Sequence, residues 1–314
     1  MENKEVTKYL ERIEIKGLWG RYDVDWKLNP DVNILVGENG TGKSTILTMV
    51  NNFFQDFFVT NKNLEKVFKK IEITYWTGKE STTEKGIAFK GTFTKTTDPS
   101  QFASGYSIKL DSYSKNSLNV KLLSTFDNEL KISDIDRKFY PDLNTELDFY
   151  LDKAIAFYKD YQLNLSKKII NQKQNIDIVY KKKEYFIETI NRLFALTEKV
   201  IDEDDNGIVF LFSDGTKINI TDLSSGEKQL LLILLTVLCQ DENPSVLLLD
   251  EPEISLHFSW QHELVKNIRI LNPNCQVIIA THSTSIFTKG WMNKIFFIDG
   301  VENERIRHKI TQKV

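Results

Sequence analysis

The sequence predicts an α/β fold in which a parallel sheet carries a phosphate-binding loop. The stretch Gly37–Thr45 reads GENGTGKST and fits the pattern G-x-x-x-x-G-K-[ST]. A short apolar run, Val32–Val36, precedes this loop, and apolar residues at helical spacing follow it. Two further runs, Val246–Leu249 and Val277–Ala280, are continuously apolar, as strands buried on both faces of a parallel sheet usually are.

Each residue type in the loop has a physical reason to be there. Gly37, Gly40 and Gly42 can take backbone angles denied to other residues, so the loop can wrap a phosphate and turn its N–H groups inward. Lys43 would place a positive charge on the β and γ phosphates, and the Ser44 hydroxyl could ligate a bridging Mg²⁺. The alternative is a glycine-rich turn that fits by chance. The predicted binding residues here are Gly37, Glu38, Asn39, Gly40, Thr41, Gly42, Lys43, Ser44 and Thr45.

The composition is that of a globular protein. Its 314 residues are 41% hydrophobic, which is ample for a core, and the net charge of −3 excludes a polycation that coats nucleic acid. Cys239 and Cys275 are the only cysteines, so neither a disulfide framework nor a cysteine zinc site is expected. The charged N-terminus lacks a signal-peptide core, and the longest apolar run, Leu230–Cys239, is far shorter than the ~20 residues of a membrane helix. We expect a cytoplasmic protein that does not enter a membrane.

Period-two patterns predict strands in the N-terminal part of the chain. Leu10–Ile15 and Asp23–Leu28 alternate, and we expect them to form one sheet with Val32–Val36. The helix predicted after the loop includes Phe57. Beyond it, apolar and polar residues alternate again, which predicts an antiparallel sheet over Val67–Trp76, Ile87–Thr94 and Tyr106–Leu110.

From about Asn144 to Leu196 the chain has no Gly or Pro and is rich in charged, aliphatic and aromatic residues, which predicts helices. A basic stretch within it is broken only by Asp177. Two interpretations stay open, a solvated helix face or a surface for DNA, RNA or a partner protein. Its residues are Lys167, Lys168, Lys173, Lys181, Lys182 and Lys183.

A polar turn then leads into the longest apolar run. Ile208–Phe212 and Lys217–Ile220 flank Asp214-Gly215, which indicates a hairpin, and the segment Leu223–Gln229, LSSGEKQ, follows it. A helix start of this kind offers N–H groups, serine hydroxyls and the positive end of the helix dipole to an anion. By itself it is also typical of an ordinary capped helix.

Polar residues end both C-terminal apolar strands. Asp250 and Glu251 follow Val246–Leu249, at the strand end where open α/β sheets bind ligands. Val277–Ala280 runs into Thr281-His282-Ser283 after a predicted helix over Trp260–Ile270. A lone histidine in such a place is more often structural, but its position after the Asp-Glu pair favours a functional role.

The order of these motifs resembles the ABC-type ATPases, and among them the soluble branch of SMC proteins, RecF and the OLD-family ATPases. GENGTGKS is similar to the Walker A motif, LSSGEKQ to the ABC signature, LLLDEPEISLH to the Walker B motif with the D-loop, and ATHS to the switch histidine. The resemblance covers about Leu10–Phe58 and Ile208–Phe297. It implies an ABC-type ATPase head, with a P-loop parallel sheet core plus an antiparallel β subdomain. Residues 1–140 and 201–314 would be its two lobes, with a helical insertion at 141–200.

The resemblance also implies roles for individual residues. Lys43 and the loop amides would hold the phosphates of ATP, and Ser44 and Asp250 would hold Mg²⁺. Glu251 would be the general base and His282 would contact the γ-phosphate, so Glu251, His282 and Lys43 are the predicted catalytic residues. The signature would reach ATP on a second copy of the chain, which implies a head-to-tail homodimer. Its predicted binding residues are Ser224, Ser225, Gly226 and Glu227.

The chain departs from the family pattern in three ways: its D-loop residue differs, and neither its Q-loop glutamine nor its adenine-stacking aromatic is clearly identified. His257, in SLH, replaces the D-loop aspartate of transporters, which favours the OLD-like branch. Gln101 is a candidate for the Q-loop glutamine. Trp19 and Tyr22 are candidates for stacking on adenine, although either could be a core residue.

The insertion between the Walker A motif and the signature is larger than in transporter heads and far smaller than SMC arms. The chain ends at Val314, which leaves no room for the C-terminal nuclease domain of OLD proteins. We therefore predict an ATPase whose ATP-dependent dimerisation controls a separate nuclease or other effector, or nucleic acid, in a bacterial anti-phage defence or toxin–antitoxin type system. The alternatives are the nucleotide-binding subunit of a membrane transporter and an ATP-binding scaffold that does not hydrolyse nucleotide.

Overall fold

The computed structural model describes residues 8–55, 68, 70–79, 86–95, 106–110, 118–124, 143–202 and 207–298. The chain divides into two compact units. The first takes its described residues from Met1–Leu123, Pro244–Glu251 and Asn274–Val314, and the second from Ser124–Asn243 and Pro252–Pro273. The predicted boundaries of two lobes and an insertion stay a prediction.

A five-stranded sheet in the first unit has the strand order β13-β3-β12-β11-β7. Strands β3, β11, β12 and β13 are parallel to their neighbours in this group, as the apolar runs predicted for β3, β11 and β12, whereas β13 was not predicted. Every residue of β11 and β12 is buried. The alternation rules used on the sequence missed β7. The strands are β3 (Val32–Val36), β7 (Asn119–Ser124), β11 (Ser245–Asp250), β12 (Cys275–Ala280) and β13 (Ile295–Phe297).

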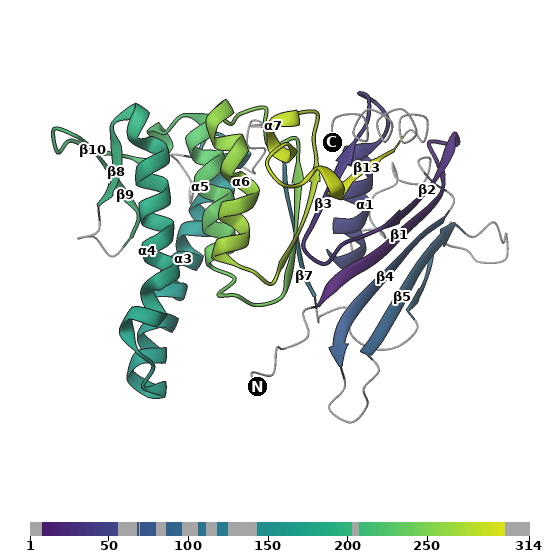
Figure 1. Ribbon diagram of the computed structural model, residues 1–314, viewed down its shortest axis with the longest axis horizontal. Helices are drawn as coiled ribbons and strands as arrows, with labels where there is room; N and C mark the ends of the chain where they lie inside the picture. The colour runs from purple at the N-terminus through teal and green to yellow at the C-terminus, as the bar shows by residue number, and fades with distance from the viewer. Residues whose placement is uncertain are drawn as a thin grey trace. The chain divides into compact units, whose positions relative to one another are not determined.

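The second sheet of this unit is antiparallel and has the order β2-β1-β4-β5-β6. Figure 1 labels its strands β2, β1, β4 and β5. The prediction that β1 and β2 share a sheet with β3 was wrong, because β3 hydrogen-bonds to β12 and β13 instead. Strand β3 is buried on both faces, which fits the parallel layer, whereas β1 alternates between buried and more exposed residues. The strands are β1 (Tyr9–Leu18), β2 (Tyr22–Lys27), β4 (Lys70–Lys79), β5 (Gly86–Lys95) and β6 (Tyr106–Leu110).

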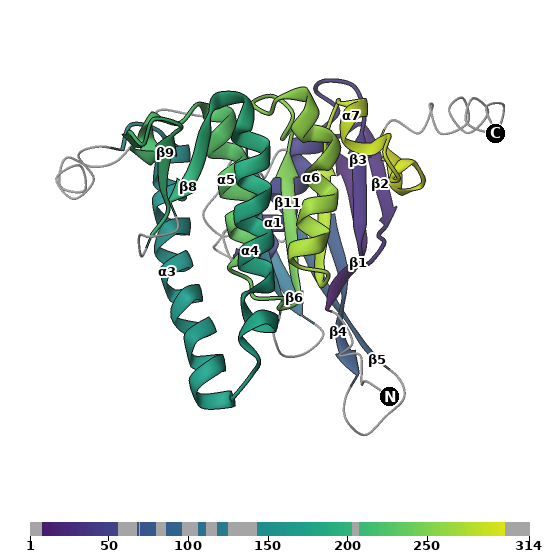
Figure 2. The same ribbon diagram turned by 60° about the vertical axis from the view of Figure 1, so that its left-hand side comes forward.

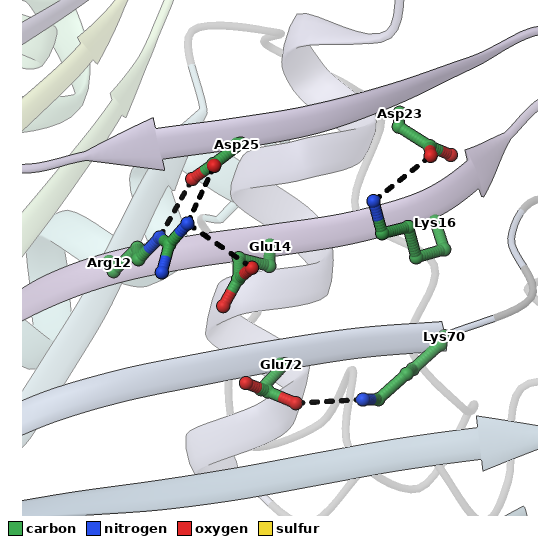
Figure 3. A network of polar contacts seen from close by, with 7 residues as sticks. All are labelled: Arg12, Glu14, Lys16, Asp23, Asp25, Lys70 and Glu72. Atoms are coloured by element: carbon green, nitrogen blue, oxygen red, sulfur yellow. Dashed lines mark hydrogen bonds and ion pairs between the residues drawn. The ribbon is translucent and has the colours of Figure 1, made fainter.

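Figure 3 shows a charged network on β1, β2 and β4. Arg12 donates to both carboxylate oxygens of Asp25 at 2.8 and 2.6 Å, and Lys70 binds Glu72 at 2.8 Å (Figure 3). Alternate residues of the same strands, such as Ile13 and Ile73, are fully buried. This alternation gives the sheet one apolar and one charged face, as the period-two pattern predicted.

Helix α1 (Lys43–Gln55) begins inside the predicted loop. Its residues Ile46, Leu47, Met49, Val50 and Phe53 belong to one core cluster that also takes side chains from β1, β4, β11 and β12. The predicted helix is confirmed as far as Gln55, and Phe57 lies outside the described residues. The core thus fixes the direction in which the start of α1 points.

The second unit is mainly helical. Helices α3 (Glu146–Gln172) and α4 (Ile176–Leu193) form a hairpin whose far end extends beyond α5 (Ser225–Leu238) and α6 (Phe258–Leu271) (Figures 1 and 2). The predicted helices are therefore confirmed. All residues of α5 from Glu227 to Leu238 are buried, which makes it the buried helix expected from its apolar run. Within the described parts of the chain, no helix is long and apolar enough to cross a membrane.

A small sheet with the order β10-β9-β8 completes the second unit. Strands β9 (Val209–Phe212) and β10 (Lys217–Ile218) form the predicted hairpin, with β8 (Lys199–Asp202) as an added antiparallel partner. Four short helices lie in described connections: η4 (Phe194–Thr197), η5 (Ile220–Asp222), α7 (Thr284–Phe287) and η6 (Met292–Lys294), the last two in the first unit.

The structure explains part of the basic stretch. Lys168 pairs with Asp241 at 2.5 Å, and Lys182 pairs with Glu242 at 3.3 Å and also donates to the carbonyl of Ile270. These two lysines help to hold the half of the hairpin nearer its turn in place. The choice between a solvated face and a binding surface stays open for the other four.

Candidate nucleotide-binding site

The predicted phosphate loop connects β3 to α1 in the first unit. Gly40 and Gly42 have φ angles of +79° and +101°, a conformation that glycine takes at little cost. Thr41 steadies the loop, because its backbone N–H and its hydroxyl both donate to the carbonyl of Glu38, at 3.3 and 2.8 Å. The first amides of α1 follow directly, so the loop ends at the positive pole of a helix.

Lys43 is buried at the first residue of α1, with a relative exposure of 4%. Its Nζ donates to the carbonyl oxygens of Gly37 and Glu38 at 3.0 and 3.1 Å, and lies 2.6 Å from Nε2 of His282. A lysine ammonium can only donate, so Nε2 must accept and the ring proton must sit on Nδ1. The ammonium is therefore held over the concave side of the loop by groups that a phosphate could replace.

Ser44 and Asp250 meet although 206 positions separate them, because α1 begins beside the carboxyl end of β11. The Ser44 hydroxyl donates to Oδ1 of Asp250 at 3.0 Å. Among the described residues, no group of three or more His, Cys, Asp or Glu side chains could hold a metal ion. A hydroxyl and one carboxylate nevertheless suit Mg²⁺, which takes few protein ligands when phosphate oxygens and water supply the others.

Glu251 directly follows β11 and adopts a left-handed φ of 46°. Its backbone N–H donates to the carbonyl of Ala280 at the end of β12, at 2.8 Å. Its carboxylate lies 3.5 Å from Nε2 of His282, which follows β12. A non-glycine residue with positive φ is strained, so the two strand ends fix the position of Glu251 against its local preference.

The structure thus brings Lys43, Ser44, Asp250, Glu251 and His282 together in the first unit. The signature residues Ser224–Glu227 belong to the second unit. Their individual roles stay predictions.

The signature turn begins α5 with a capping box. Ser224 is the N-cap, and its Oγ accepts from the backbone N–H of Glu227 at 3.3 Å while donating to Glu227 Oε2 at 2.9 Å. The Glu227 side chain is fully buried and also binds Lys199 Nζ at 2.8 and 2.9 Å and the Thr197 hydroxyl at 2.7 Å. Sequence reasoning identified Ser224 and Glu227 but missed Lys199 and Thr197, because nothing local links them to the signature.

The lowered pKa of Glu227 makes the free energy of unfolding depend on pH. Burial alone would raise the pKa of Glu227, but hydrogen bonds from Lys199, Thr197 and Ser224 outweigh burial and hold the pKa below its ordinary value of 4.5. Its contribution to stability is therefore present above pH 4.5 and is lost as the pH falls through the lower pKa of the folded state.

We expect Glu227→Gln to be less stable than the wild type at pH 7, with a difference that shrinks as the pH falls below 4.5. Urea unfolding at several pH values would measure it. A difference in unfolding free energy that does not change with pH would contradict the assignment.

Gly226 is required by close packing. A Cβ at this position would lie 2.2 Å from the carbonyl oxygen of Ser255, in the turn before α6. We expect Gly226→Ala to lower the free energy of unfolding by about 1–3 kcal/mol, although alanine favours helices. Urea unfolding checks this, with Gly207→Ala as the matched control, because its Cβ would meet only Lys159 Cε at 3.9 Å. Equal stability of the two variants would contradict the prediction.

The three departures from the family pattern have different outcomes. His257 is the N-cap of α6, and its side chain accepts from the backbone N–H of Ser259, so the histidine has a structural role as a cap. Trp19 is 49% exposed and its Nε1 lies 3.2 Å from the position of a Cβ on Gly42, so it is beside the loop and not in the core. Gln101 and the Tyr22 side chain lie outside the described residues.

Comparison with known proteins identifies related sequences. The family described as "AAA domain, putative AbiEii toxin, Type IV TA system" matches residues 32–288. The "Retron Vc95 probable ATPase" of Vibrio cholerae serotype O1 biovar El Tor is 26% identical over 153 residues, which cover 45% of this chain and 30% of that protein. "Multidrug resistance protein 1" of Plasmodium falciparum (isolate FC27 / Papua New Guinea) is 24% identical over 96% of this chain and 19% of its own length.

The fold has a known counterpart among solved structures. The SMC head in "Crystal structure of the SmcHead bound to the C-winged helix domain of ScpA" superposes with a TM-score of 0.54 at 15% identity, covering 92% of this chain and 93% of that one. The likeness confirms the predicted fold class, an ABC-type ATPase head. The chain spans less than a third of the length of the two relatives named above.

Proposed function

This chain belongs to the family described as "AAA domain, putative AbiEii toxin, Type IV TA system", and from this premise we propose that it hydrolyses ATP when two copies close head to tail. The observation that carries the proposal is the convergence of Lys43, Ser44, Asp250, Glu251 and His282 in one unit. Such a set can hold a triphosphate and a metal ion beside a general base.

In this proposal the residues of the first unit act by charge and position. Lys43 exchanges the carbonyls of Gly37 and Glu38 for the β and γ phosphates, and the loop amides donate to the phosphate oxygens. Glu251 would accept a proton from the attacking water, and His282 would contact the γ-phosphate. Ser44 and Asp250 would hold Mg²⁺, which when bound neutralises charge that develops on the phosphates.

The homodimer is proposed from the signature. Ser224 and the first amides of α5 present the donors of a helix start, which suit the γ-phosphate of a second copy. Each copy would supply the signature for its partner's ATP, so closure would complete both sites at once. Hydrolysis would then limit how long the closed dimer lasts.

We further propose that the closed dimer controls a separate effector, such as a nuclease, or nucleic acid, in an anti-phage defence or toxin–antitoxin type system. The family match and the similarity to a retron ATPase support this role. The similarity to a multidrug resistance protein leaves a transporter subunit as the second candidate. ATP-driven association with a soluble effector would favour the first, and association with a membrane protein the second.

The test is the mass of Glu251→Gln in solution with and without ATP and Mg²⁺. A variant that binds ATP but cannot hydrolyse it should accumulate as a dimer of about 73 kDa, twice the 36.5 kDa of the chain. Lys43→Met in the same background is the control, because it should not bind ATP and should not dimerise. A Glu251→Gln protein that binds ATP and keeps the same mass would overturn the proposal.

A further inference from the structure

The signature serine has a partner that competes with phosphate. Ser224 Oγ donates to Glu227 Oε2 at 2.9 Å, and a hydroxyl has one proton to donate. Ser224 must therefore release Glu227 before it can donate to a γ-phosphate. The free-energy cost of this change of partner depends on how well the Glu227 carboxylate is neutralised once the serine hydroxyl has left.

Lys199 is the group that can keep this carboxylate neutralised. Its Nζ lies 2.9 and 2.8 Å from the two oxygens of Glu227, and the relative exposures of the two side chains are 12% and 0%. The Thr197 hydroxyl and the backbone N–H of Ser224 add two more donors, at 2.7 and 2.9 Å. Glu227 thus keeps four hydrogen bonds when the serine hydroxyl leaves.

The turn between α4 and β8 places these donors. Thr197 ends η4 and Lys199 begins β8, and Glu198 between them takes a left-handed φ of 55° with its side chain exposed. This conformation is uncommon for glutamate. It lets the side chains of Thr197 and Lys199, on either side of Glu198, both donate to the carboxylate of Glu227. The strain is retained where two side chains must converge.

We propose that Lys199 is a positioning residue for ATP-driven closure, which it allows by holding Glu227 neutralised while Ser224 exchanges that carboxylate for the γ-phosphate. This inference rests on the proposed function. Without Lys199, the buried Glu227 carboxylate would be uncompensated and would repel the incoming γ-phosphate. It would also hold the Ser224 hydroxyl proton more tightly. Closure would weaken, whereas ATP binding to the first unit would not.

The test uses Glu251→Gln, so that dimers accumulate, and measures the dimer dissociation constant in ATP and Mg²⁺. Adding Lys199→Met should weaken dimerisation at least about tenfold, whereas ATP binding to the monomer should change less than about threefold. Lys199→Arg keeps the positive charge, so its dimer dissociation constant should stay close to that of the Glu251→Gln background. Lys199→Met with Glu227→Gln removes both charges and should recover dimer affinity relative to Lys199→Met alone, because no uncompensated carboxylate then holds the serine proton.

Asp148→Asn is the matched control. Asp148 makes a second buried pair with the signature helix, 2.8 Å from Lys228, but its carboxylate binds Lys228 and Thr145, not Ser224. This variant should lose stability and keep its dimer affinity. If Lys199→Met dimerises like the background, or the double variant does not recover, the inference is wrong. If the Glu251→Gln background binds ATP but does not dimerise, the proposed function fails and the inference fails with it.

Discussion

Lys43→Met is expected to weaken ATP binding about 100-fold or more and to abolish turnover. The ammonium is already placed over the loop by Gly37, Glu38 and His282, so it needs little rearrangement to meet a phosphate. Methionine keeps most of the side chain's length and apolar volume and removes the charge. A loss of 100-fold corresponds to about 2.7 kcal/mol, within the range for truncating one partner of a buried charge-assisted contact.

Titration with a fluorescent ATP analogue and a phosphate-release assay would measure both effects. Lys294→Met is the matched control, since Lys294 pairs with Asp31 at 2.8 Å in the same unit and is not among the predicted site residues. Unchanged ATP affinity in Lys43→Met would show that this loop is not the phosphate site.

Glu251→Gln is expected to lower ATP turnover by about 10²–10⁴-fold, the usual contribution of a general base. The amide is nearly the same size as the carboxylate, so the strained turn and the contact with Ala280 should remain. ATP affinity should change little, because the lysine and the loop supply the phosphate contacts.

Single-turnover phosphate release under saturating ATP separates this effect from a change in binding. Glu263→Gln is a suitable control, because Glu263 pairs with the exposed Arg192 on α4 and is not among the predicted site residues. A scaffold that does not use hydrolysis would show no turnover in the wild type, and Glu251→Gln would then behave like its parent.

The sequence alone determined the features that depend on neighbouring residues. The loop from Gly37 to Thr45 needs glycines with positive φ, and that requirement is local. The apolar runs that became β3, β11 and β12 are recognised by their lack of alternation, and the buried helix α5 by its length. The placing of Asp250 and Glu251 at a strand end follows directly from these patterns.

Only the tertiary structure decided which distant segments meet. The assignment of β3 to the parallel sheet depends on hydrogen bonds to β12 and β13, which lie more than 240 positions further on. The clash that excludes a side chain at Gly226 comes from Ser255, and the charge that neutralises Glu227 comes from Lys199. The periodicity of apolar residues indicates which face of a helix or strand is buried, but not which other segment packs against that face. Contacts between residues far apart in the sequence are therefore found only in the folded chain.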